Sequence, residues 1–297
     1  MRAEISRSRS PIRKTTRLCA SVVLGAAALM AVGGIIAPAS AESTLERARK
    51  QGYVRIAIAN EPPWTEVKAD GKVTGAAPEV ARAVMKKLGV PELLATVTEY
   101  GAMIPGLQAG RFDMVTAGLF IKPKRCAAIL FSEPDLCDAE AFAVKKGNPL
   151  GLKTYADIAK HSSAKVGAPG GGTEEQLAVE AGVPRSRIVV VPDAQSGVNM
   201  LQSGRIDVYA LPTLSLSDLL KKANDPNLAL VSPVAGTPIF CAGAGFRKSD
   251  RALRDAYDKV LAKMKKSGEF DKIVSSFSFP AKAASMTSRK KLCGGPN

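Results

Sequence analysis

The spacing of hydrophobic residues after position 41 predicts strands that alternate with helices. Residues 53–59 alternate in the period-2 pattern of a half-buried strand. Residues 77–88 repeat apolar side chains at helical spacing, and Gly89 follows as a helix end. The same reasoning predicts a leading helix at 44–51, strands at 94–98 and 113–116, and a helix at 103–108. This alternation is typical of an α/β fold.

A second series repeats the plan of the first. The segment at 106–114 contains Gly-Arg-Phe-Asp, and the segment at 200–208 contains Gly-Arg-Ile-Asp. Each segment predicts a helix end, a glycine cap and a strand. The second series predicts strands at 165–168, 187–191 and 207–211, a helix opened by 169–175 and a helix at 197–202. Helices at 249–266 and 268–277 and a basic tail end the chain.

Two α/β lobes follow from the two series. Strand patterns at 139–144 and 240–246 bracket the second series and predict two crossovers that act as a hinge. The predicted division assigns residues 42–138 to the first part of lobe 1, residues 139–238 to lobe 2, and residues 239–297 to the return into lobe 1 and the tail.

The first 41 residues have the pattern of an export signal. Basic residues come first, an apolar run covers residues 18–37, and Ala39-Ser40-Ala41 forms an A-x-A cleavage site. A membrane anchor is the alternative, but glycines and a proline interrupt the run. No later segment is apolar for long enough to span a bilayer. We therefore predict an exported, periplasmic protein that is cleaved after Ala41.

The charge of the chain does not indicate a nucleic-acid partner. The full sequence has a net charge of +15, and removal of the export signal leaves about +10, because the signal carries six basic residues and one acidic residue. The remaining basic residues are scattered through predicted helices and aromatic residues are few, so a solvated surface is the simpler interpretation.

Four cysteines remain after cleavage: Cys126, Cys137, Cys241 and Cys293. An even number in an exported chain predicts two disulfides, for which sequence alone allows three pairings. No C-x-x-C spacing occurs, and the one histidine, His161, lies in a polar loop. We therefore expect neither a metal site nor a cofactor.

Aromatic residues follow the carboxyl ends of three predicted strands, the edge at which open α/β sheets bind ligands. They are Trp64, Tyr100 and Phe120, and Glu61 precedes Trp64 in a proline-rich loop. The three rings predict an aromatic cage. A tryptophan that caps a core edge and aromatic lids in loops are the structural alternatives.

Arg125 lies in the first turn of a helix predicted to begin at Pro123. The helix dipole does not favour a cation there, so an anionic ligand held by the guanidinium and the helix start would explain the position. A surface arginine is the alternative. In lobe 2, glycines at 170–172 and Thr173 either receive a ligand or form a plain capped turn. No Gly-Lys-Ser/Thr follows, so this is not a P-loop.

Catalysis is not expected from these residues. Glu61, Glu99 and Asp193 could act as acids or bases. However, the sequence contains no Gly-x-Ser-x-Gly motif, no Ser/His/Asp set and no His/Cys cluster. We therefore predict that the protein is not an enzyme.

Three short motifs indicate a family. Pro123-x-Arg125 is followed by Phe-Ser-Glu-Pro at 131–134, Gly-Arg-x-Asp occurs twice, and Lys-Lys-Gly-Asn-Pro lies at 145–149. In these motifs the chain resembles the type II periplasmic binding proteins of polar-amino-acid ABC importers. The resemblance implies two Rossmann-like α/β lobes joined by a two-strand hinge, with Arg125 on the ligand carboxylate. Pro212 replaces the aspartate that usually binds an α-ammonium, and Gly-Ala-Ala-Pro at 75–78 replaces the usual Gly-Phe-Asp.

Longer stretches at 58–63, 99–106 and 168–175 are similar to the ectoine/hydroxyectoine-binding branch of this family. The resemblance implies that three aromatic rings enclose the ligand ring, a glutamate meets its cation and an arginine takes its carboxylate. These residues are Trp64, Tyr100 and Phe120, then Glu61, then Arg125. Trp64 stands where phenylalanine is expected.

The resemblance further implies a solute-binding protein that delivers ectoine or hydroxyectoine to the membrane permease of an ABC importer. We expect a monomer that closes on its ligand, with lobe 2 contacts from Gly172, Thr173 and Gln195. The alternatives are another zwitterion (proline, a betaine, an opine or a polar amino acid) or a dehydratase on the same fold.

The hinge suggests one disulfide pairing among the three. Cys137 and Cys241 lie at the two predicted crossovers, so we expect them to pair. That pairing leaves Cys126 with Cys293.

Overall fold

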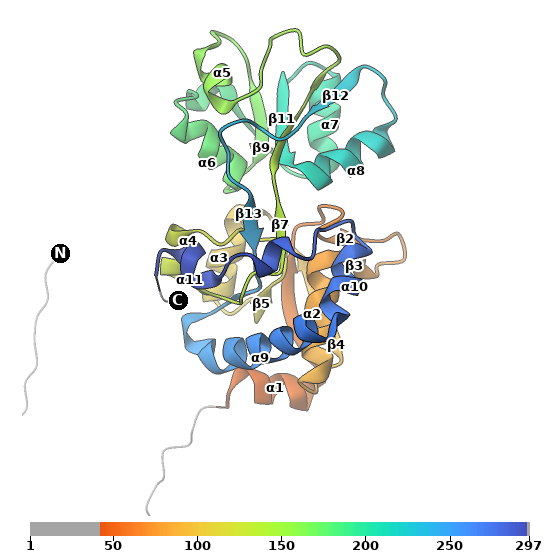
Figure 1. Ribbon diagram of the computed structural model, residues 1–297, viewed down its shortest axis with the longest axis vertical. Helices are drawn as coiled ribbons and strands as arrows, with labels where there is room; N and C mark the ends of the chain where they lie inside the picture. The colour runs from red at the N-terminus through yellow and green to blue at the C-terminus, as the bar shows by residue number, and fades with distance from the viewer. Residues whose placement is uncertain (1–41, 296–297) are drawn as a thin grey trace, which may run out of the picture. The chain divides into compact units, whose positions relative to one another are not determined.

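The computed structural model describes residues 42–295. The export signal predicted over residues 1–41 lies outside the described residues. Two five-stranded sheets with surrounding helices form the framework (Figure 1), which confirms the predicted α/β class. No helix in the described part of the chain is long and apolar enough to cross a membrane.

The first sheet has the strand order β4-β1-β5-β14-β6. β1 is parallel to β4 and β5, and β14 is antiparallel to β5 and β6. The strands are β1 (Tyr53–Ile58), β4 (Glu92–Val97), β5 (Met114–Val115), β6 (Leu130–Phe131) and β14 (Gly245–Phe246).

Helices pack buried side chains against this sheet in two separate cores. One core includes α2 (Ala76–Lys87), α9 (Arg251–Ser267) and α10 (Glu269–Ser275). The other includes α3 (Tyr100–Gln108) and α4 (Pro123–Ala128). We call the first sheet with these helices and α1 (Thr44–Gln51) lobe 1. A short hairpin of β2 (Glu66–Val67) and β3 (Val73–Thr74) projects before α2.

The second sheet repeats this plan with the order β10-β9-β11-β8-β12. β9 is parallel to β10 and β11, and β8 is antiparallel to β11 and β12. The strands are β8 (Glu140–Lys145), β9 (Val166–Pro169), β10 (Ile188–Val191), β11 (Val208–Pro212) and β12 (Leu228–Val231).

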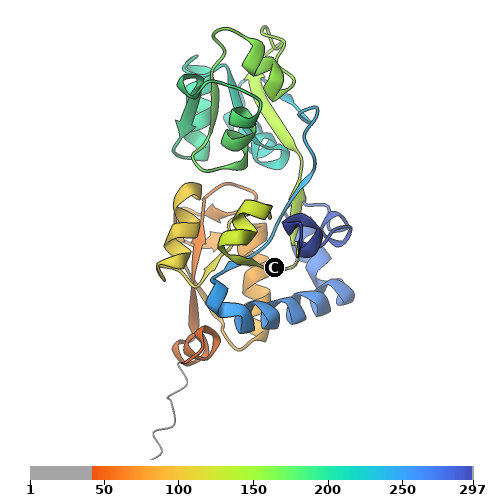
Figure 2. The same cartoon turned by 90° about the vertical axis from the view of Figure 1, so that its left-hand side faces the viewer.

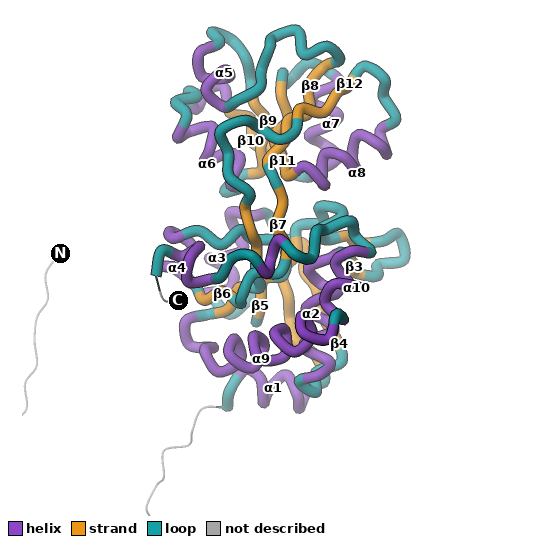
Figure 3. Tube along the Cα trace, viewed as in Figure 1, coloured by secondary structure: helices purple, strands orange, loops and turns teal. Residues whose placement is uncertain are grey.

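Two pairs of helices flank the second sheet (Figure 3). α5 (Tyr155–Lys160) and α6 (Thr173–Glu180) contribute to one core, and α7 (Ala194–Gln202) and α8 (Thr213–Ala223) to the other. A 3₁₀ turn, η1 (Arg185–Arg187), precedes β10. We call the second sheet with these elements lobe 2.

The repeated Gly-Arg-x-Asp motif has the same structural role in both lobes. The carboxylate of Asp113 accepts the backbone N–H of Arg55 at 3.1 Å, and the N–H of Asp113 donates to the carbonyl of Arg55 at 2.8 Å. Asp207 makes the equivalent pair with Lys165, at 2.8 and 2.9 Å. The aspartate thus joins the start of a strand to its parallel neighbour in each sheet.

Two short antiparallel strands, β7 (Leu136–Asp138) and β13 (Phe240–Ala242), connect the lobes (Figures 1 and 2). Cys137 lies opposite Cys241 in this ladder, and a disulfide joins the two residues. The segment 240–246, predicted as one strand, is two strands, because β14 turns away into the first sheet. The predicted strand at 139–144 is β8 of the second sheet, so the crossover itself lies just before it.

The C-terminal segment, for which a return to lobe 1 and a basic tail were predicted, is folded against lobe 1. It contains η3 (Ala283–Ser285) and α11 (Arg289–Cys293), and a disulfide joins Cys293 to Cys126 of α4. Another 3₁₀ turn, η2 (Lys248–Asp250), leads into α9.

Candidate functional site

A small cavity lies between the lobes. Its walls are Glu61, Trp64, Tyr100, Gly118, Phe120 and Arg125 from lobe 1, and Thr173, Glu174 and Pro212 from lobe 2. The structure therefore brings together six of the eight residues predicted to bind ligand.

Four of the six lobe 1 walls follow the carboxyl ends of β1 and β5. Asn60 begins the first loop in the left-handed region, with a φ of 53°, which asparagine tolerates better than most residues. Glu61 and Trp64 come next, while Gly118 and Phe120 follow β5. Gly118 has a φ of 71°, and a Cβ there would collide with the Trp64 ring. Glycine is needed for the indole to form this wall.

The aromatic walls contact one another. Trp64 meets Phe120 edge to face with ring centroids 5.6 Å apart, and Phe120 stacks on Phe240 of β13 at 5.3 Å. Tyr100, which was predicted to lie in a loop, is the first residue of α3, and its hydroxyl donates to the Ala117 carbonyl at 2.6 Å. Phe240 was not predicted, and it brings the crossover into contact with the cage.

Trp64, a wall residue of the cavity, carries a buried hydrogen-bond donor. Its side chain is 1% exposed, and its indole Nε1 has no partner among residues 42–295. Buried polar groups nearly always have a hydrogen-bond partner, so a free donor in a cavity wall is suited to a ligand acceptor.

Arg125 is the cation that lines the cavity. Its Nη1 donates to the Phe120 carbonyl at 3.0 Å, and its Nη2 donates to the Gly171 carbonyl of lobe 2 at 3.1 Å. Burial lowers the pKa of Arg125, and the nearby Glu174 opposes that effect. A guanidinium has five donors, so these two bonds leave it able to bind an anion.

Two carboxyl groups line the same cavity. Ser215 of α8 donates its hydroxyl to Glu61 Oε1 at 2.6 Å. Burial raises the pKa of Glu61 to about 8, and Glu174 adds to the rise. Burial also raises the pKa of Glu174, while backbone N–H groups at the start of α6 and Arg125 oppose it. Two buried acids therefore share a small space with one guanidinium.

More buried acid lies behind this pair. Burial raises the pKa of Asp138 to about 6, although the N–H groups of Leu214 and Ala139 lower it. Glu140 is fully buried, both of its carboxylate oxygens lack a partner among the described residues, and burial raises its pKa well above the usual range. The region therefore contains more buried carboxyl groups than cationic partners, and a bound cation would stabilise their ionised forms.

The three lobe 2 residues that were predicted as contacts have different positions. Thr173 lines the cavity, and its buried Oγ1 has no partner within residues 42–295. Gly172 is the N-cap of α6 and lines a separate surface cavity beside Arg125. Gln195 is exposed, bonds Asn199 at 3.2 Å and is not a wall residue, so the structure does not bring it to this cavity.

Four further acidic or hydroxyl residues of the site were not predicted from the sequence: Glu174, Ser215, Asp138 and Glu140. Glu174 was visible as the second residue of a helix that follows a glycine-rich turn. The other three residues carry no sequence signal, because each reaches the site through the packing of lobe 2 against the crossovers.

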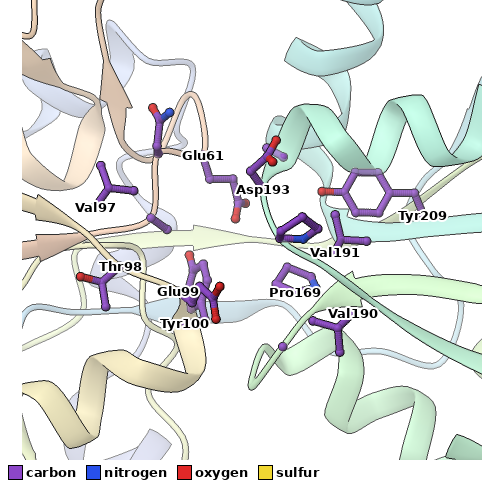
Figure 4. Close-up of a pocket in the computed structure, with 15 residues that line it drawn as sticks. Glu61, Val97, Thr98, Glu99, Tyr100, Pro169, Val190, Val191, Asp193 and Tyr209 are labelled. Atoms are coloured by element: carbon purple, nitrogen blue, oxygen red, sulfur yellow. The ribbon is translucent and has the colours of Figure 1, made fainter.

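A wider cavity adjoins the first and shares Glu61 and Tyr100 with it (Figure 4). Figure 4 shows Glu61 extending from lobe 1 toward the lobe 2 elements. Glu99 and Asp193 also line this space, and Asp193 caps α7 by accepting the Ser196 N–H at 2.9 Å.

The described part of the chain contains no cluster of His, Cys, Asp or Glu that could hold a metal ion. His161 has a structural role, since its Nδ1 accepts the backbone N–H groups of Ser163 and Ala164 at 3.3 and 3.1 Å.

Comparison with known proteins gives a family and several relatives. The bacterial extracellular solute-binding proteins, family 3, match residues 54–280. A probable amino-acid ABC transporter periplasmic-binding protein, y4tE of Sinorhizobium fredii, is 35% identical over 259 residues, which cover 84% of this chain and 86% of that protein.

Two solved structures are informative. The crystal structure of EhuB in complex with hydroxyectoine is 65% identical, with a TM-score of 0.84, and the match covers 85% of this chain and 99% of that one. The ancestral amino acid-binding protein AncCDT-1, described as a precursor of cyclohexadienyl dehydratase, is 29% identical. Its TM-score is 0.70, with 79% of this chain and 98% of that chain covered.

Proposed function

Because the chain belongs to the bacterial extracellular solute-binding proteins, family 3, we propose that it is the binding component of an ABC importer and that its ligand is ectoine or hydroxyectoine. The observation that carries the proposal is the cavity, which combines one guanidinium, two carboxyl groups and three aromatic rings. The proposed contacts are Glu61, Trp64, Tyr100, Phe120, Arg125, Thr173 and Glu174, with the backbone of Gly172 beside them.

The guanidinium of Arg125 would bind the ligand carboxylate. It is half-buried and already fixed by two backbone carbonyls, so it can present its remaining donors to both carboxylate oxygens without much loss of entropy. The free hydroxyl of Thr173 and the free N–H of Trp64 are further donors in the same walls.

The carboxylates of Glu61 and Glu174 would meet the ligand cation from opposite lobes. Ectoine carries its positive charge on an amidinium, in which two N–H groups flank one carbon. Two carboxylates suit two divergent donors better than they suit one compact ammonium. The aromatic walls add about 0.5–2 kcal/mol each for a cation held against a ring face without water.

Pro212 lines the cavity where a family member for α-amino acids would carry an aspartate. It offers no charge and no N–H, which favours a ligand without a primary α-ammonium. EhuB, whose structure holds hydroxyectoine, is 65% identical to this chain. The two observations support the same ligand class.

Binding would proceed by closure of two lobes. We propose that residues 139–238 move as lobe 2 about β7 and β13, while residues 42–138 and 239–295 stay together. A ligand that contacts walls from both lobes favours the closed state over the open one.

The N-terminal segment supports export to the periplasm. A basic start, an apolar run and Ala39-Ser40-Ala41 would direct cleavage after Ala41. A monomer would then deliver the ligand to a membrane permease.

A dehydratase is the rival function, because AncCDT-1 is described as a precursor of such an enzyme. Glu61, with a pKa of about 8, could act as a general acid. Binding and release of unchanged cyclic carboxylates would count against this alternative and support a protein that is not an enzyme.

Calorimetry of the mature protein tests the proposal. Ectoine and hydroxyectoine are expected to give saturable heat, whereas proline, glycine betaine and arginine should bind weakly or not at all. Tight binding of a competitor, together with no heat from either ectoine or hydroxyectoine, would refute the ligand assignment.

A further inference from the structure

We propose that Ser215 is a positioning residue that links the cation-binding oxygen of Glu61 to closure of the lobes. The inference rests on the proposed function, because it assigns a task at the same site. Ser215 itself does not line the ligand cavity, so its effect would pass through Glu61.

The hydrogen bond between these residues joins the two lobes. Ser215 is the third residue of α8 in lobe 2, and Glu61 follows β1 in lobe 1. Their oxygens lie 2.6 Å apart across 154 positions of sequence. The serine is 0% exposed and the glutamate 5% exposed. When the lobes separate, this bond must break and both groups return to water.

The start of α8 is tied to the hinge. The N–H of Leu214 donates to the Asp138 carboxylate at 2.8 Å, and the N–H of Thr213 donates to the Ala139 carbonyl at 2.8 Å. Asp138 ends β7, which is one of the two crossovers. The position of the Ser215 hydroxyl is therefore set by the crossover about which lobe 2 would move.

The bond divides the two oxygens of Glu61 between two tasks. Oε1 accepts from Ser215, which leaves Oε2 and the remaining lone pairs for a ligand N–H. A carboxylate held by one donor loses less rotational freedom when it binds a second donor. A hydrogen bond to the ionised form also favours the charge that a cationic ligand requires.

The electrostatic surroundings of Glu61 make this donor important. Five acidic or phenolic groups of the packed elements interact electrostatically with it: Glu174 of α6, Asp138 of β7, Glu140 of β8, Tyr100 of α3 and Tyr209 of β11. Arg125 lines the same cavity, but its guanidinium donates to the backbone carbonyls of Phe120 and Gly171. Ser215 is thus a neutral donor in an acidic cluster.

The test compares Ser215→Ala with a matched control, Ser217→Ala, which removes an exposed hydroxyl two positions later on the same helix. By calorimetry with ectoine near neutral pH, Ser215→Ala should bind about tenfold more weakly or worse, because a hydrogen bond to a charged group is lost. Ser217→Ala should match the wild type, and Ser215→Thr, which keeps a hydroxyl, should recover most of the affinity.

A readout without ligand separates this inference from the ligand assignment. Trp64 is the one tryptophan of the chain and shares the cavity wall with Glu61, so its fluorescence reports on that wall. The hydrogen bond from Ser215 lowers the pKa of Glu61. In ligand-free protein, removal of this bond by Ser215→Ala should therefore raise that pKa and shift the pH midpoint of the fluorescence upward.

The outcomes are distinct. If the wild type gives no heat with ectoine, the ligand assignment fails, and the fluorescence titration still tests Ser215. If Ser215→Ala binds within about twofold of the wild type and its fluorescence midpoint is unchanged, Ser215 does not position Glu61. Tighter binding by Ser215→Ala would mean that the serine competes with the ligand, which also contradicts the inference.

Discussion

The charged side chains around the cavity lack partners of opposite charge when no ligand is bound. Arg125 has donors to spare beyond its two backbone bonds, and burial disfavours its charge. Glu61 and Glu174 are buried acids with raised pKa values. A zwitterion with a carboxylate at one end and a spread cation at the other would satisfy both kinds of group at once.

Replacement of Arg125 tests the carboxylate end. Arg125→Ala should weaken ectoine binding by about 2–5 kcal/mol, because the ligand carboxylate would be buried without its partner. The affinity of Arg125→Lys for ectoine should lie between those of Arg125→Ala and the wild type, since lysine keeps the charge but not the bidentate geometry. Calorimetry measures both variants, and unchanged affinity in Arg125→Ala would mean that the carboxylate binds elsewhere.

At the scale of residues, the sequence was sufficient to predict a site residue where a single short segment determines its position. Arg125 at a helix start and the aromatic residues after strands were predicted, and the cavity brings them together. Glu174 and Ser215 were not predicted, because their positions depend on how α6 and α8 meet lobe 1. Gln195 was predicted from its loop but lies on the exposed side of α7.

At the scale of elements, α3 and the turn before α6 form a contact between the lobes that consists of backbone. The N–H of Gly101 donates to the Gly170 carbonyl at 3.0 Å. A Cβ on Gly171 would lie 2.6 Å from the Gly101 Cα, and a Cβ on Gly101 would lie 3.3 Å from the Gly170 oxygen. Glycine on both sides allows this close approach.

Gly101→Ala tests whether this contact serves closure. The added methyl group should hold the lobes slightly apart and weaken ligand binding by about threefold to tenfold. Alanine favours a helix over glycine by up to about 1 kcal/mol, so thermal stability without ligand should be equal or higher. A loss of both stability and affinity would instead indicate damage to α3.

The disulfide between α4 and α11 secures the C-terminal helix to the element that carries Arg125. Replacing Cys126 and Cys293 together by serine should lower the free energy of unfolding by about 2–5 kcal/mol, as for native disulfides in other exported domains. Denaturant titration under oxidising conditions measures this change. An unchanged midpoint would show that packing alone holds α11 in place.

Elements with a clear hydrophobic period were predicted to within a few residues, as for α1 at 44–51 and α2. The start of α3 was placed three residues late, because Tyr100 and Gly101 have low helix propensity and tertiary contacts fix them. Residues 240–246 were predicted as a single strand, since nothing in the sequence marks the point at which the chain leaves the crossover and enters the first sheet. α11 was missed because its basic residues resemble a solvated tail.

At the scale of the whole molecule, the buried acids oppose closure without ligand. Burial between the lobes raises the pKa of Glu61 from 4.5 to about 8. A carboxyl group whose pKa is higher in the closed form than in the open form stabilises the closed form. This contribution is complete at pH values below the pKa of the open form and is lost as the pH rises through the pKa of the closed form. Near neutral pH, closure without a cation is therefore penalised, and closure with one is not.

The radius of gyration from X-ray scattering measures this effect. The ligand-free protein should be more compact at about pH 5 than at about pH 9, and saturation with ectoine should make it compact at both. The Glu61→Gln variant should show a smaller pH response and poor ligand binding. A ligand-free wild type with the same radius at both pH values would contradict the penalty.

A crystal structure of the protein with hydroxyectoine tests the central claim most directly. We predict one ligand in the interlobe cavity, with its carboxylate on Arg125, its ring enclosed by Trp64, Tyr100 and Phe120, and its amidinium between Glu61 and Glu174. A ligand bound outside this cavity, or bound there with its carboxylate away from Arg125, would contradict the account.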